Sequence, residues 1–467
     1  MGVPVYKRIL DLFEAEGVNT LFGIPDPNFV HMFTEAEARG WSVVAPHHEL
    51  SAGFMAEAAS RMTGKPGLCI GTLGPGMANI AGAIQCALVE NSPVIFLGGQ
   101  RARVTERRVR RGRIQFVQQE PLFEASVKFS SSIEYADQTD EIIREAIRRS
   151  MSGTPGPSYV EYPSHVILEE LDVADPLPPH RYRLVNQGAG AAEVAKAATL
   201  IREAKSPILL VGHGVHTSRT QQEVKQLADL MNCPVIQTSG GTSYIPGLQD
   251  RTFPYLFSPA ANQAVEESDL CVALGTELGE PMHYGRTQHW AGNDANRKWV
   301  YVEQDPTAIG VNRQFDVPLV GDLRGVVPQL VQALKDTPRT PSPNLDALMK
   351  ADAEELAQLA ENAPSGRSPI HPARYVVEST KAFNELEDPI LVRDGGATVI
   401  FQWTYSQSKP RDVIWNQNFG HLGTGLPYAV GASVAEGGRR PVMLLTSDSA
   451  FLFHIAELET AARLNLP

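Results

Sequence analysis

The chain has 467 residues, of which 43% are hydrophobic and 20% charged, and its formal net charge is −12. At about 150 residues per domain, this length predicts about three domains rather than a single core. The acidic balance opposes nucleic-acid binding, and no apolar run reaches the ~18 residues that a membrane span needs, so we expect neither nucleic acid nor membrane as a partner.

The first third of the chain alternates helices with strands. Predicted helices cover 3–16, 27–38, 49–63 and 77–89, and predicted strands cover 18–22, 42–45, 67–71 and 93–98. Such alternation is typical of a parallel sheet with helices on both faces. A proline-rich passage over 172–179 ends this unit, so we place a first domain at 1–171.

Two further units follow. The second begins with a helix over 191–204 and an apolar strand over 208–211, and we place this domain at 188–334. After a polar helix and a proline-containing loop, strands over 390–392, 413–415 and 442–445 mark a third domain at 365–467. The sequence therefore predicts an α/β protein of three doubly wound parallel-sheet domains.

Cysteine usage and the N-terminus bear on the compartment. The four cysteines lie in apolar surroundings without metal-type spacing, which favours buried thiols over disulfides or zinc ligands. Residues 1–17 place apolar side chains on one face of a helix and charged side chains elsewhere, unlike the continuous apolar core of a signal peptide. We therefore expect a cytoplasmic protein.

Seven arginines crowd into residues 101–113, after the strand over 93–98. One interpretation is a solvated loop or a subunit-contact surface, and the other is a grip on an anionic substrate or phosphate tail. The sequence leaves both open.

Four motifs carry the candidate chemistry. In chain order they are His48-Glu49 before an apolar helix, the loop Gly74-Pro75-Gly76 with Asn79, the stretch Gly425-Leu426-Pro427-Tyr428-Ala429-Val430-Gly431-Ala432, and Asp448 after an apolar strand. A carboxylate at the end of such a strand suits a divalent cation that carries a diphosphate. Each motif alone is weak, but four in this order are specific.

With these motifs, the chain resembles the acetolactate synthase-like thiamine diphosphate enzymes over essentially its whole length. The resemblance implies a pyrimidine-binding, a central nucleotide-fold-like and a diphosphate-binding domain, with thiamine diphosphate and Mg²⁺ as cofactors. It implies cleavage or ligation of a C–C bond in a 2-oxo acid or 1,2-diketone. Because family members pair the first domain of one subunit with the third of another, it also implies a homodimer or homotetramer.

The resemblance gives Glu49 the role of hydrogen-bonding the pyrimidine ring of the cofactor. A helix N-terminus stabilises an ionised carboxyl by about 0.3–1 kcal/mol, and we expect burial to outweigh this, so that Glu49 shares or donates a proton near neutrality. The alternative is an ordinary solvated helix-capping glutamate. The apolar wedge under the cofactor falls on Leu422, with the Gly420 carbonyl beside it, and plain core packing is the alternative for Leu422.

The diphosphate side depends on Asp448 as the first metal ligand. Further cofactor contacts implied by the resemblance are Gly74, Pro75, Gly76, Asn79, Gly395, Gly396, Ala397, Thr398, Ser447, Ser449 and Ala450. Ser447 and Ala397-Thr398 replace the family's Gly and Gln-His, so we expect altered phosphate contacts. Since the family's second metal ligand and last strands lie beyond this point, we predict a C-terminally truncated chain whose third domain is incomplete and whose cofactor binding is weak.

Candidates for contact with substrate are Asn28, His31 and Gln115, of which Gln115 matches the Gln of the family's Phe-Gln-Glu. Polar Asn28 and His31 suit proton transfer to a diketone, and their loop resembles that of cyclohexane-1,2-dione hydrolase. A lone surface histidine is the alternative for His31. The central domain resembles a flavin-binding domain, so FAD is a possible further cofactor, although relatives often keep this domain empty. A non-catalytic paralogue or partner subunit is the rival to an enzyme.

Overall fold

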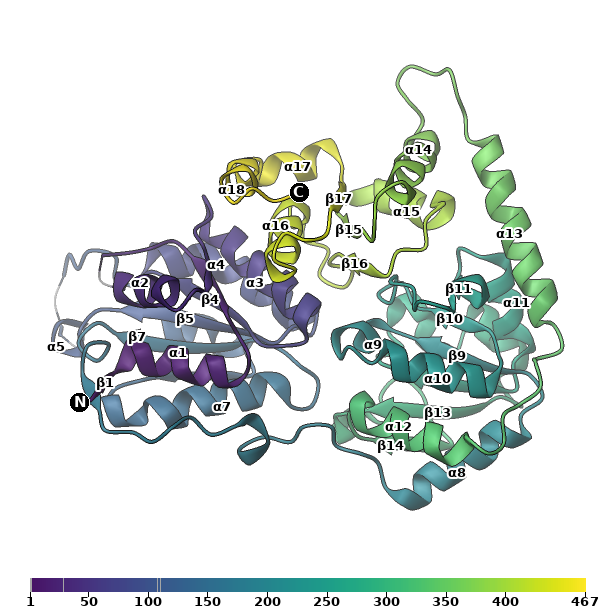
Figure 1. Cartoon of the computed structure of the whole chain (residues 1–467), viewed down its shortest axis with the longest axis horizontal. Coiled ribbons are helices and arrows are strands. Elements are labelled where there is room, and N and C mark those ends of the chain that lie inside the picture. Colours follow the sequence, from purple (N-terminus) through teal and green to yellow (C-terminus); the bar gives the residue numbers. More distant parts are fainter. Residues whose placement is uncertain (1, 28, 107, 110) are drawn as a thin grey trace. The chain divides into compact units, whose positions relative to one another are not determined.

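The structure is a computed structural model that describes residues 2–27, 29–106, 108–109 and 111–467. It is a mixed α/β protein with parallel sheets, as predicted (Figure 1). The chain divides into two compact units: residues 1–184, 392–395 and 414–467 form unit 1, and residues 185–391 and 396–413 form unit 2. The expected boundaries at 1–171, 188–334 and 365–467 stay a prediction.

The sheet of unit 1 has the order β3-β2-β4-β5-β7-β6, and all its pairs are parallel. The elements up to residue 171 are β1 Val3–Pro4, α1 Val5–Ala15, β2 Thr20–Gly23, α2 Val30–Ala38, β3 Ser42–Val44, α3 Glu49–Thr63, β4 Gly67–Gly71, α4 Pro75–Val89, β5 Val94–Gln100, α5 Arg103–Glu106, α6 Gln119–Phe123, β6 Phe129–Ser132, α7 Thr139–Met151, β7 Ser158–Pro163 and β8 Glu170–Leu171. Helices α1 and α7 cover one face, and α3 and α4 cover the other (Figure 1).

Two predicted helix starts are wrong. The helix expected from residue 3 begins at Val5, because Val3 and Pro4 form a short antiparallel pair with β8, far away in the sequence. The helix expected from residue 27 begins at Val30, because the Phe29 N–H donates to the Asp26 carbonyl and closes a turn first. Local periodicity shows neither contact.

The sheet of unit 2 is also wholly parallel, in the order β11-β10-β9-β12-β13-β14. Its elements up to residue 362 are α8 Ala191–Glu203, β9 Pro207–Val211, α9 His213–Thr217, α10 Gln221–Met231, β10 Val235–Gln237, β11 Thr252–Pro254, α11 Pro259–Glu267, β12 Leu270–Leu274, β13 Lys298–Glu303, β14 Val317–Val320, α12 Leu323–Leu334 and α13 Leu345–Asn362. Leu209 and Val211 face one core with α8, α10 and α12, whereas Ile208 and Leu210 face another with α11. A continuous apolar strand is therefore buried on both faces.

The remaining elements are α14 Pro372–Asn384, β15 Ile390–Arg393, α15 Gly396–Tyr405, β16 Asp412–Ile414, α16 Gly425–Ala435, β17 Val442–Leu445, α17 Asp448–Phe453 and α18 Glu457–Arg463. Strands β16, β15 and β17 form a sheet in this order. Within unit 1, α16 packs along α3 so closely that a Cβ at Gly431 would lie 2.3 Å from the Met55 carbonyl oxygen. The close packing of α16 on α3 therefore requires glycine at position 431.

The four cysteines are free and buried, as the sequence predicts. Burial raises the pKa of each thiol, in Cys233 and Cys271 to about 12. Among the described residues, no helix combines the length and apolarity that crossing a bilayer requires.

Candidate active site

The first residue of α3 is Glu49, the residue expected to act on the cofactor. The side chain of His48 caps the helix by accepting a hydrogen bond from the Leu50 N–H at 3.0 Å. Glu49 Oε2 accepts from Nδ2 of Asn79 at 3.0 Å, and the carboxyl is half-buried. The side chain of Glu49 is therefore less buried in the single chain than the sequence predicts. Its carboxylate lies close to the first turns of both α3 and α4.

The glycine loop between β4 and α4 approaches this carboxylate. Gly74 has φ +63°, and a Cβ there would lie 2.2 Å from the Gln115 carbonyl oxygen, so the turn requires glycine. A Cβ on Gly76 would lie 2.5 Å from Cγ2 of Thr72 and 3.5 Å from Oε1 of Glu49. Oγ1 of Thr72 is buried and has no hydrogen-bond partner among the described residues.

Gln119 is a residue that the sequence reasoning missed. Its Oε1 accepts from the Gly74 N–H at 2.6 Å, and its Nε2 donates to the Gly99 carbonyl and to Oη of Tyr159. Gln119 is buried and is followed by Glu120, whereas Gln115 is exposed and followed by Phe116. The dipeptide Gln119-Glu120 was the available signal, because the family pattern has Glu directly after Gln.

Helix α18 holds the segment that leads into α3. The buried carboxylate of Glu457 accepts from the His47 N–H, at 3.1 and 3.3 Å from its two oxygens. Arg463 donates to the Ala45 carbonyl at 2.7 Å, and Nε2 of His47 lies 2.7 Å from Oε2 of Glu459. The hydrogen bond from His47 helps to lower the pKa of Glu459. The start of α3 is thus fixed by residues about 410 positions away in the same chain.

Histidines gather around the first turns of α3. Nδ1 of His454 lies 2.9 Å from Oγ of Ser51, and the His454 ring lies 6.0 Å from that of His48. Phe54 packs edge-on against His421, with 5.1 Å between ring centroids. Burial, with smaller contributions from His48 and His421, lowers the pKa of His454 to about 4. His454 is therefore neutral at physiological pH, and its Nε2 is buried without a partner among the described residues.

The segment 416–423 carries the two residues expected beside the cofactor rings. Gly420 has φ +68°, and Leu422 is 40% exposed, so Leu422 is not a core residue. Nδ2 of Asn416 donates to the His421 carbonyl at 2.9 Å, and the N–H groups of Asn418 and Phe419 donate to Oε1 of Glu90 at 2.6 and 2.8 Å. The exposure of Leu422 argues against the core-packing alternative.

The expected metal ligand, Asp448, is the first residue of α17 and is exposed. Its Oδ1 accepts from the Ser449 N–H at 2.8 Å, and Ala450 is buried. A Cβ on Gly395 would lie 2.3 Å from Oγ of Ser447, so this serine packs on the turn that follows β15. Across the described ranges, no three His, Cys, Asp or Glu side chains form a ready metal site. Asp448 can thus supply one ligand.

A second carboxylate, that of Asp394, follows strand β15, which neighbours β17 in the sheet. Oδ2 of Asp394, at the end of β15, accepts from the Gly425 N–H at 2.8 Å and so fixes the start of α16. Burial raises the pKa of Asp394, while hydrogen bonds from the backbone of Gly425, Gly423 and Gly395 oppose the shift. Asp394 is a positioning group that the sequence did not reveal.

The other phosphate candidates start a helix of unit 2. Gly396, Ala397 and Thr398 are the first three residues of α15, reached through Gly395 at φ +89°. The N–H groups in the first turn of a helix lack partners within the helix, which suits an anion.

Two of the expected substrate contacts, His31 and Gln115, make no described contact with Glu49. His31 is exposed on α2 and faces the Tyr6 ring of α1 at 5.7 Å, and Gln115 is exposed as well. Asn28 lies outside the described residues. Their roles stay a prediction, and the described contacts of His31 resemble those of a surface histidine.

The arginine-rich stretch is partly engaged within the protein. Arg103 contacts Glu134 and Glu161, and the Arg113 guanidinium lies 3.2 Å from the centre of the Phe116 ring. Arg107 and Arg110 lie outside the described residues.

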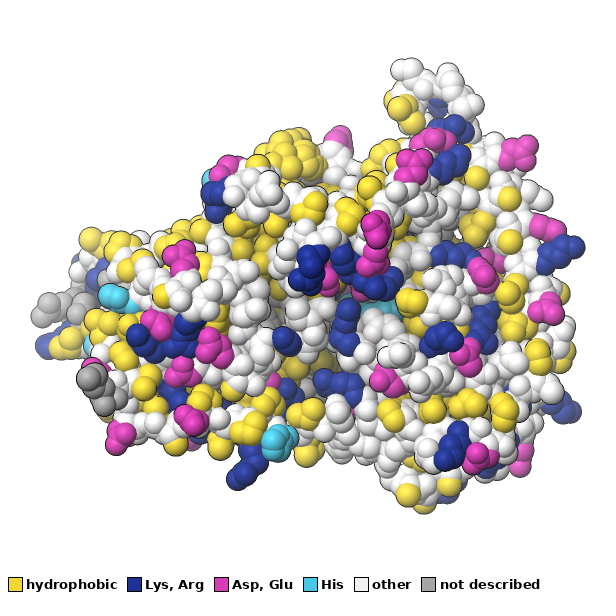
Figure 2. Space-filling model, viewed as in Figure 1, with side chains coloured by type: hydrophobic (Ala, Val, Ile, Leu, Met, Phe, Trp, Pro, Cys, Tyr) yellow, Lys and Arg dark blue, Asp and Glu magenta, His cyan; other side chains and the backbone are white. Residues whose placement is uncertain are grey.

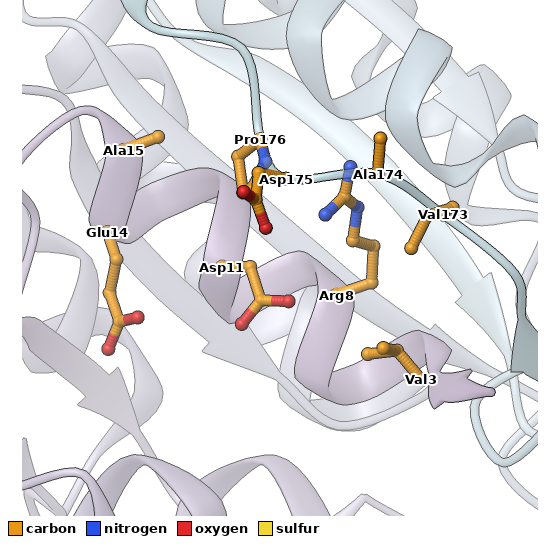
Figure 3. A pocket seen from close by; sticks show the side chains of 9 residues that line it. All are labelled: Val3, Arg8, Asp11, Glu14, Ala15, Val173, Ala174, Asp175 and Pro176. Atoms are coloured by element: carbon orange, nitrogen blue, oxygen red, sulfur yellow. The ribbon is translucent and has the colours of Figure 1, made fainter. Parts of the chain in front are cut away.

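A groove of about 460 Å³ lies along α1 and residues 173–176 (Figure 3). Figure 3 shows Asp11, Glu14 and Asp175 around it, and its cation, Arg8, binds Asp140 through Nε and Nη2 at 2.6 and 2.7 Å. None of the predicted site residues is among the described residues that line this groove, and Arg8, the cation among them, is paired with Asp140.

Three family models match this chain. They are described as the thiamine pyrophosphate enzyme N-terminal TPP binding domain at residues 4–123, the central domain at 194–330 and the C-terminal TPP binding domain at 394–467. Their order agrees with the motifs at Glu49 and at Asp448, which fall in the two TPP binding domains.

The chain belongs to the thiamine diphosphate-dependent enzymes.

Its similarity to named relatives places this enzyme in the acetolactate synthase-like group. It is 28% identical to a probable acetolactate synthase large subunit of Methanococcus aeolicus, over 99% of this chain and 78% of the relative. It is 26% identical to 2-hydroxyacyl-CoA lyase of Arabidopsis thaliana and 25% identical to oxalyl-CoA decarboxylase of Escherichia coli, over 79% and 80% of those proteins. The protein is thus a thiamine diphosphate-dependent lyase or transferase that acts on C–C bonds.

Proposed function

We propose that this enzyme cleaves or joins the C–C bond beside the carbonyl of a 2-oxo acid or a 1,2-diketone. Acetolactate synthase, oxalyl-CoA decarboxylase and 2-hydroxyacyl-CoA lyase, by their names, share chemistry at a carbon beside a carbonyl. The observation that carries the proposal is Glu49 at the start of α3, bound to Asn79 and adjoining the glycine loop.

The residues around Glu49 fit the cofactor. Two buried polar atoms, Oγ1 of Thr72 and Nε2 of His454, have no partner among the described residues, and buried polar groups in native proteins nearly always find one. Leu422 presents an exposed apolar side chain from the segment that also carries Gly420. When bound, thiamine diphosphate supplies a nucleophilic carbon that adds to a carbonyl.

The side chains divide the work of binding and proton movement. Glu49 exchanges a proton with the pyrimidine ring, Asn79 orients its carboxyl, and Leu422 and Gly420 shape the space for the rings. Asp448 provides a carboxylate for Mg²⁺, and Gly74 to Gly76, Gly395 to Thr398, and Ser447, Ser449 and Ala450 make the remaining contacts. His454, whose lowered pKa keeps it neutral, can accept a hydrogen bond at one ring nitrogen and donate one from the other without bringing a charge.

We propose that the enzyme is a homodimer or homotetramer. Leu452, Phe453, Ile455 and Leu458, on and between α17 and α18, are 43% to 61% exposed. Figure 2 shows hydrophobic side chains gathered over α17. Apolar surface of this kind marks protein interfaces, and a second copy of the chain suits the family's pairing of domains.

Two finer points belong to the same proposal. In the central domain, Gly212 and Gly214 pack closely on Gly275, and FAD is the further cofactor proposed for this domain. Hydrolytic ring opening of a cyclic 1,2-dione is the alternative reaction.

Cofactor titration followed by a substrate panel tests the proposal. The protein is titrated with thiamine diphosphate and Mg²⁺, and then assayed with 2-oxo acids, linear and cyclic 1,2-diones, and 2-hydroxyacyl- and oxalyl-CoA thioesters. We expect saturable binding and cofactor-dependent turnover of a 2-oxo acid or dione, with kcat lowered about 10²- to 10⁴-fold in Glu49→Gln. Turnover only of CoA thioesters would overturn the substrate class, and absence of saturable binding in any oligomeric state would overturn the cofactor site.

A further inference from the structure

Glu90, the residue that follows α4, is almost fully buried, with 5% of its surface exposed. Its Oε1 accepts hydrogen bonds from the backbone N–H groups of Asn418 and Phe419 at 2.6 and 2.8 Å. Those two residues directly precede Gly420, and Leu422 follows two positions after Gly420. A carboxylate from the N-terminal domain therefore fixes the backbone of the segment that is proposed to shape the cofactor cradle.

A buried ionic network sets the position of Glu90. Nη2 of Arg61 lies 3.3 Å from Oε2 of Glu90 and 2.7 Å from Oε1 of Glu57. Nη1 of Arg61 donates to the Trp415 carbonyl at 2.6 Å, so the same network also holds the chain just before the segment 416–423. Tyr428 of α16 closes the network through its Oη, which donates to Oε2 of Glu57 at 2.8 Å.

The charges in this network do not cancel. Two carboxylates face one guanidinium, and burial raises the pKa of Glu90, an effect that Arg61 and the Phe419 and Asn418 N–H groups oppose. Burial alone would lower the pKa of Arg61, but Glu57, Tyr428 and Glu90 raise it above its ordinary value. Replacing a buried ion pair by apolar side chains of similar volume is often neutral or stabilising. Here the protein instead buries the charged Glu90, whose two shortest hydrogen bonds are accepted from the backbone of one segment. This arrangement indicates that the backbone conformation of that segment is important for function.

We propose that Glu90 is a positioning residue for the reaction. It sets the backbone of residues 418 and 419, and through it the Gly420 carbonyl and the Leu422 side chain, in the conformation that receives the cofactor. The inference rests on the proposed function, because the roles of Gly420 and Leu422 do. Glu90 itself touches neither substrate nor cofactor in this account.

Three variants separate positioning from bulk stability. Glu90→Ala removes both acceptor bonds to the segment. Glu90→Gln keeps one oxygen that accepts from Asn418 and Phe419 while removing the charge opposite Arg61. Glu16→Ala is the matched control, because Glu16 is 7% exposed and pairs with Arg183 at 2.6 Å but bonds to residues 182 and 183 rather than to the segment.

Amide hydrogen exchange of Asn418 and Phe419 is measured first, without cofactor. Protection should fall in Glu90→Ala and persist in Glu90→Gln and Glu16→Ala. The thiamine diphosphate Kd at saturating Mg²⁺ should then rise about 10- to 100-fold in Glu90→Ala, about the contribution of one charge-assisted hydrogen bond, with the Gln variant within about threefold of the native protein.

The outcomes distinguish the two claims. Equal exchange in the native protein and Glu90→Ala, or equal Kd values despite faster exchange, would overturn the positioning role. Equal losses of affinity in Glu90→Ala and Glu16→Ala would also overturn it, because that pattern reports general destabilisation. If the native protein binds no thiamine diphosphate, the proposed function fails, whereas the exchange result still decides whether Glu90 holds the segment.

Discussion

Replacing Gly431 tests the packing that places the start of α3. A Cβ at this position would lie 2.3 Å from the carbonyl oxygen and 2.7 Å from the Cα of Met55, both backbone atoms of α3. Contact at an ordinary distance of about 3.5 Å would require α16 to move away from α3 by about 1.2 Å. Because backbone atoms cannot swing aside, the strain falls on the whole helix pair.

The expected magnitude follows from two opposing effects. Alanine gains about 1 kcal/mol over glycine in a helix interior, whereas overpacking of a tight contact costs typically about 1–3 kcal/mol. We therefore expect Gly431→Ala to destabilise the protein by up to about 2 kcal/mol and Gly431→Val by more, because valine adds two further methyl groups. At about 2–4 °C per kcal/mol for a unit of this size, Gly431→Ala lowers Tm by up to about 8 °C.

Thermal unfolding followed by circular dichroism measures the shift, with Gly292→Ala as control. Gly292 lies in a short 3-10 helix, and a Cβ there would meet nothing closer than 3.7 Å, so its Tm should stay within about 2 °C. Gly431→Ala should also weaken thiamine diphosphate binding, since the strain falls on α3, which begins at Glu49, and on α16, which follows the segment 416–423. A Tm equal to or above that of the native protein would refute the reasoning, because the helix-propensity gain would then exceed the contact cost.

Three other predictions concern protonation and thiol chemistry. Glu49→Gln should lower kcat about 10²- to 10⁴-fold, the range for a positioned proton-transfer group, while Tm changes little; an unchanged kcat would remove Glu49 from the mechanism. Burial lowers the pKa of His216 to about 4, so the folded state favours the neutral ring. The contribution of the neutral His216 ring to the free energy of unfolding is complete above about pH 6.5. As the pH falls from there toward 4, the free energy of unfolding decreases by up to about 3 kcal/mol. Urea titrations of the native protein and His216→Leu at pH 7 and pH 4.5 measure this, and equal pH dependence in both would contradict it. The four buried thiols should react with a thiol reagent only after unfolding, and rapid labelling of the native protein would contradict their burial.

The sequence alone determined the elements whose signal is local. The helix over 49–63 and the strands over 67–71 and 442–445 have the predicted bounds, because apolar periodicity and flanking glycines specify them. Motif order likewise led to the thiamine diphosphate enzymes, since Glu49, the glycine loop and Asp448 each carry chemistry in few residues.

Tertiary structure decided what depends on partners far along the chain. Val3 and Pro4 form a strand because of residues 170 and 171, and the start of α3 is held by Glu457. Gln119 rather than Gln115 bonds to the glycine loop, and Glu90 bonds to the segment 416–423. A buried carboxylate has no periodicity that shows which backbone N–H groups it accepts, because that choice is made only when the sheet and its helices have packed. The sequence therefore determined the chemistry of this protein, and the packing of distant segments decided which side chains position it.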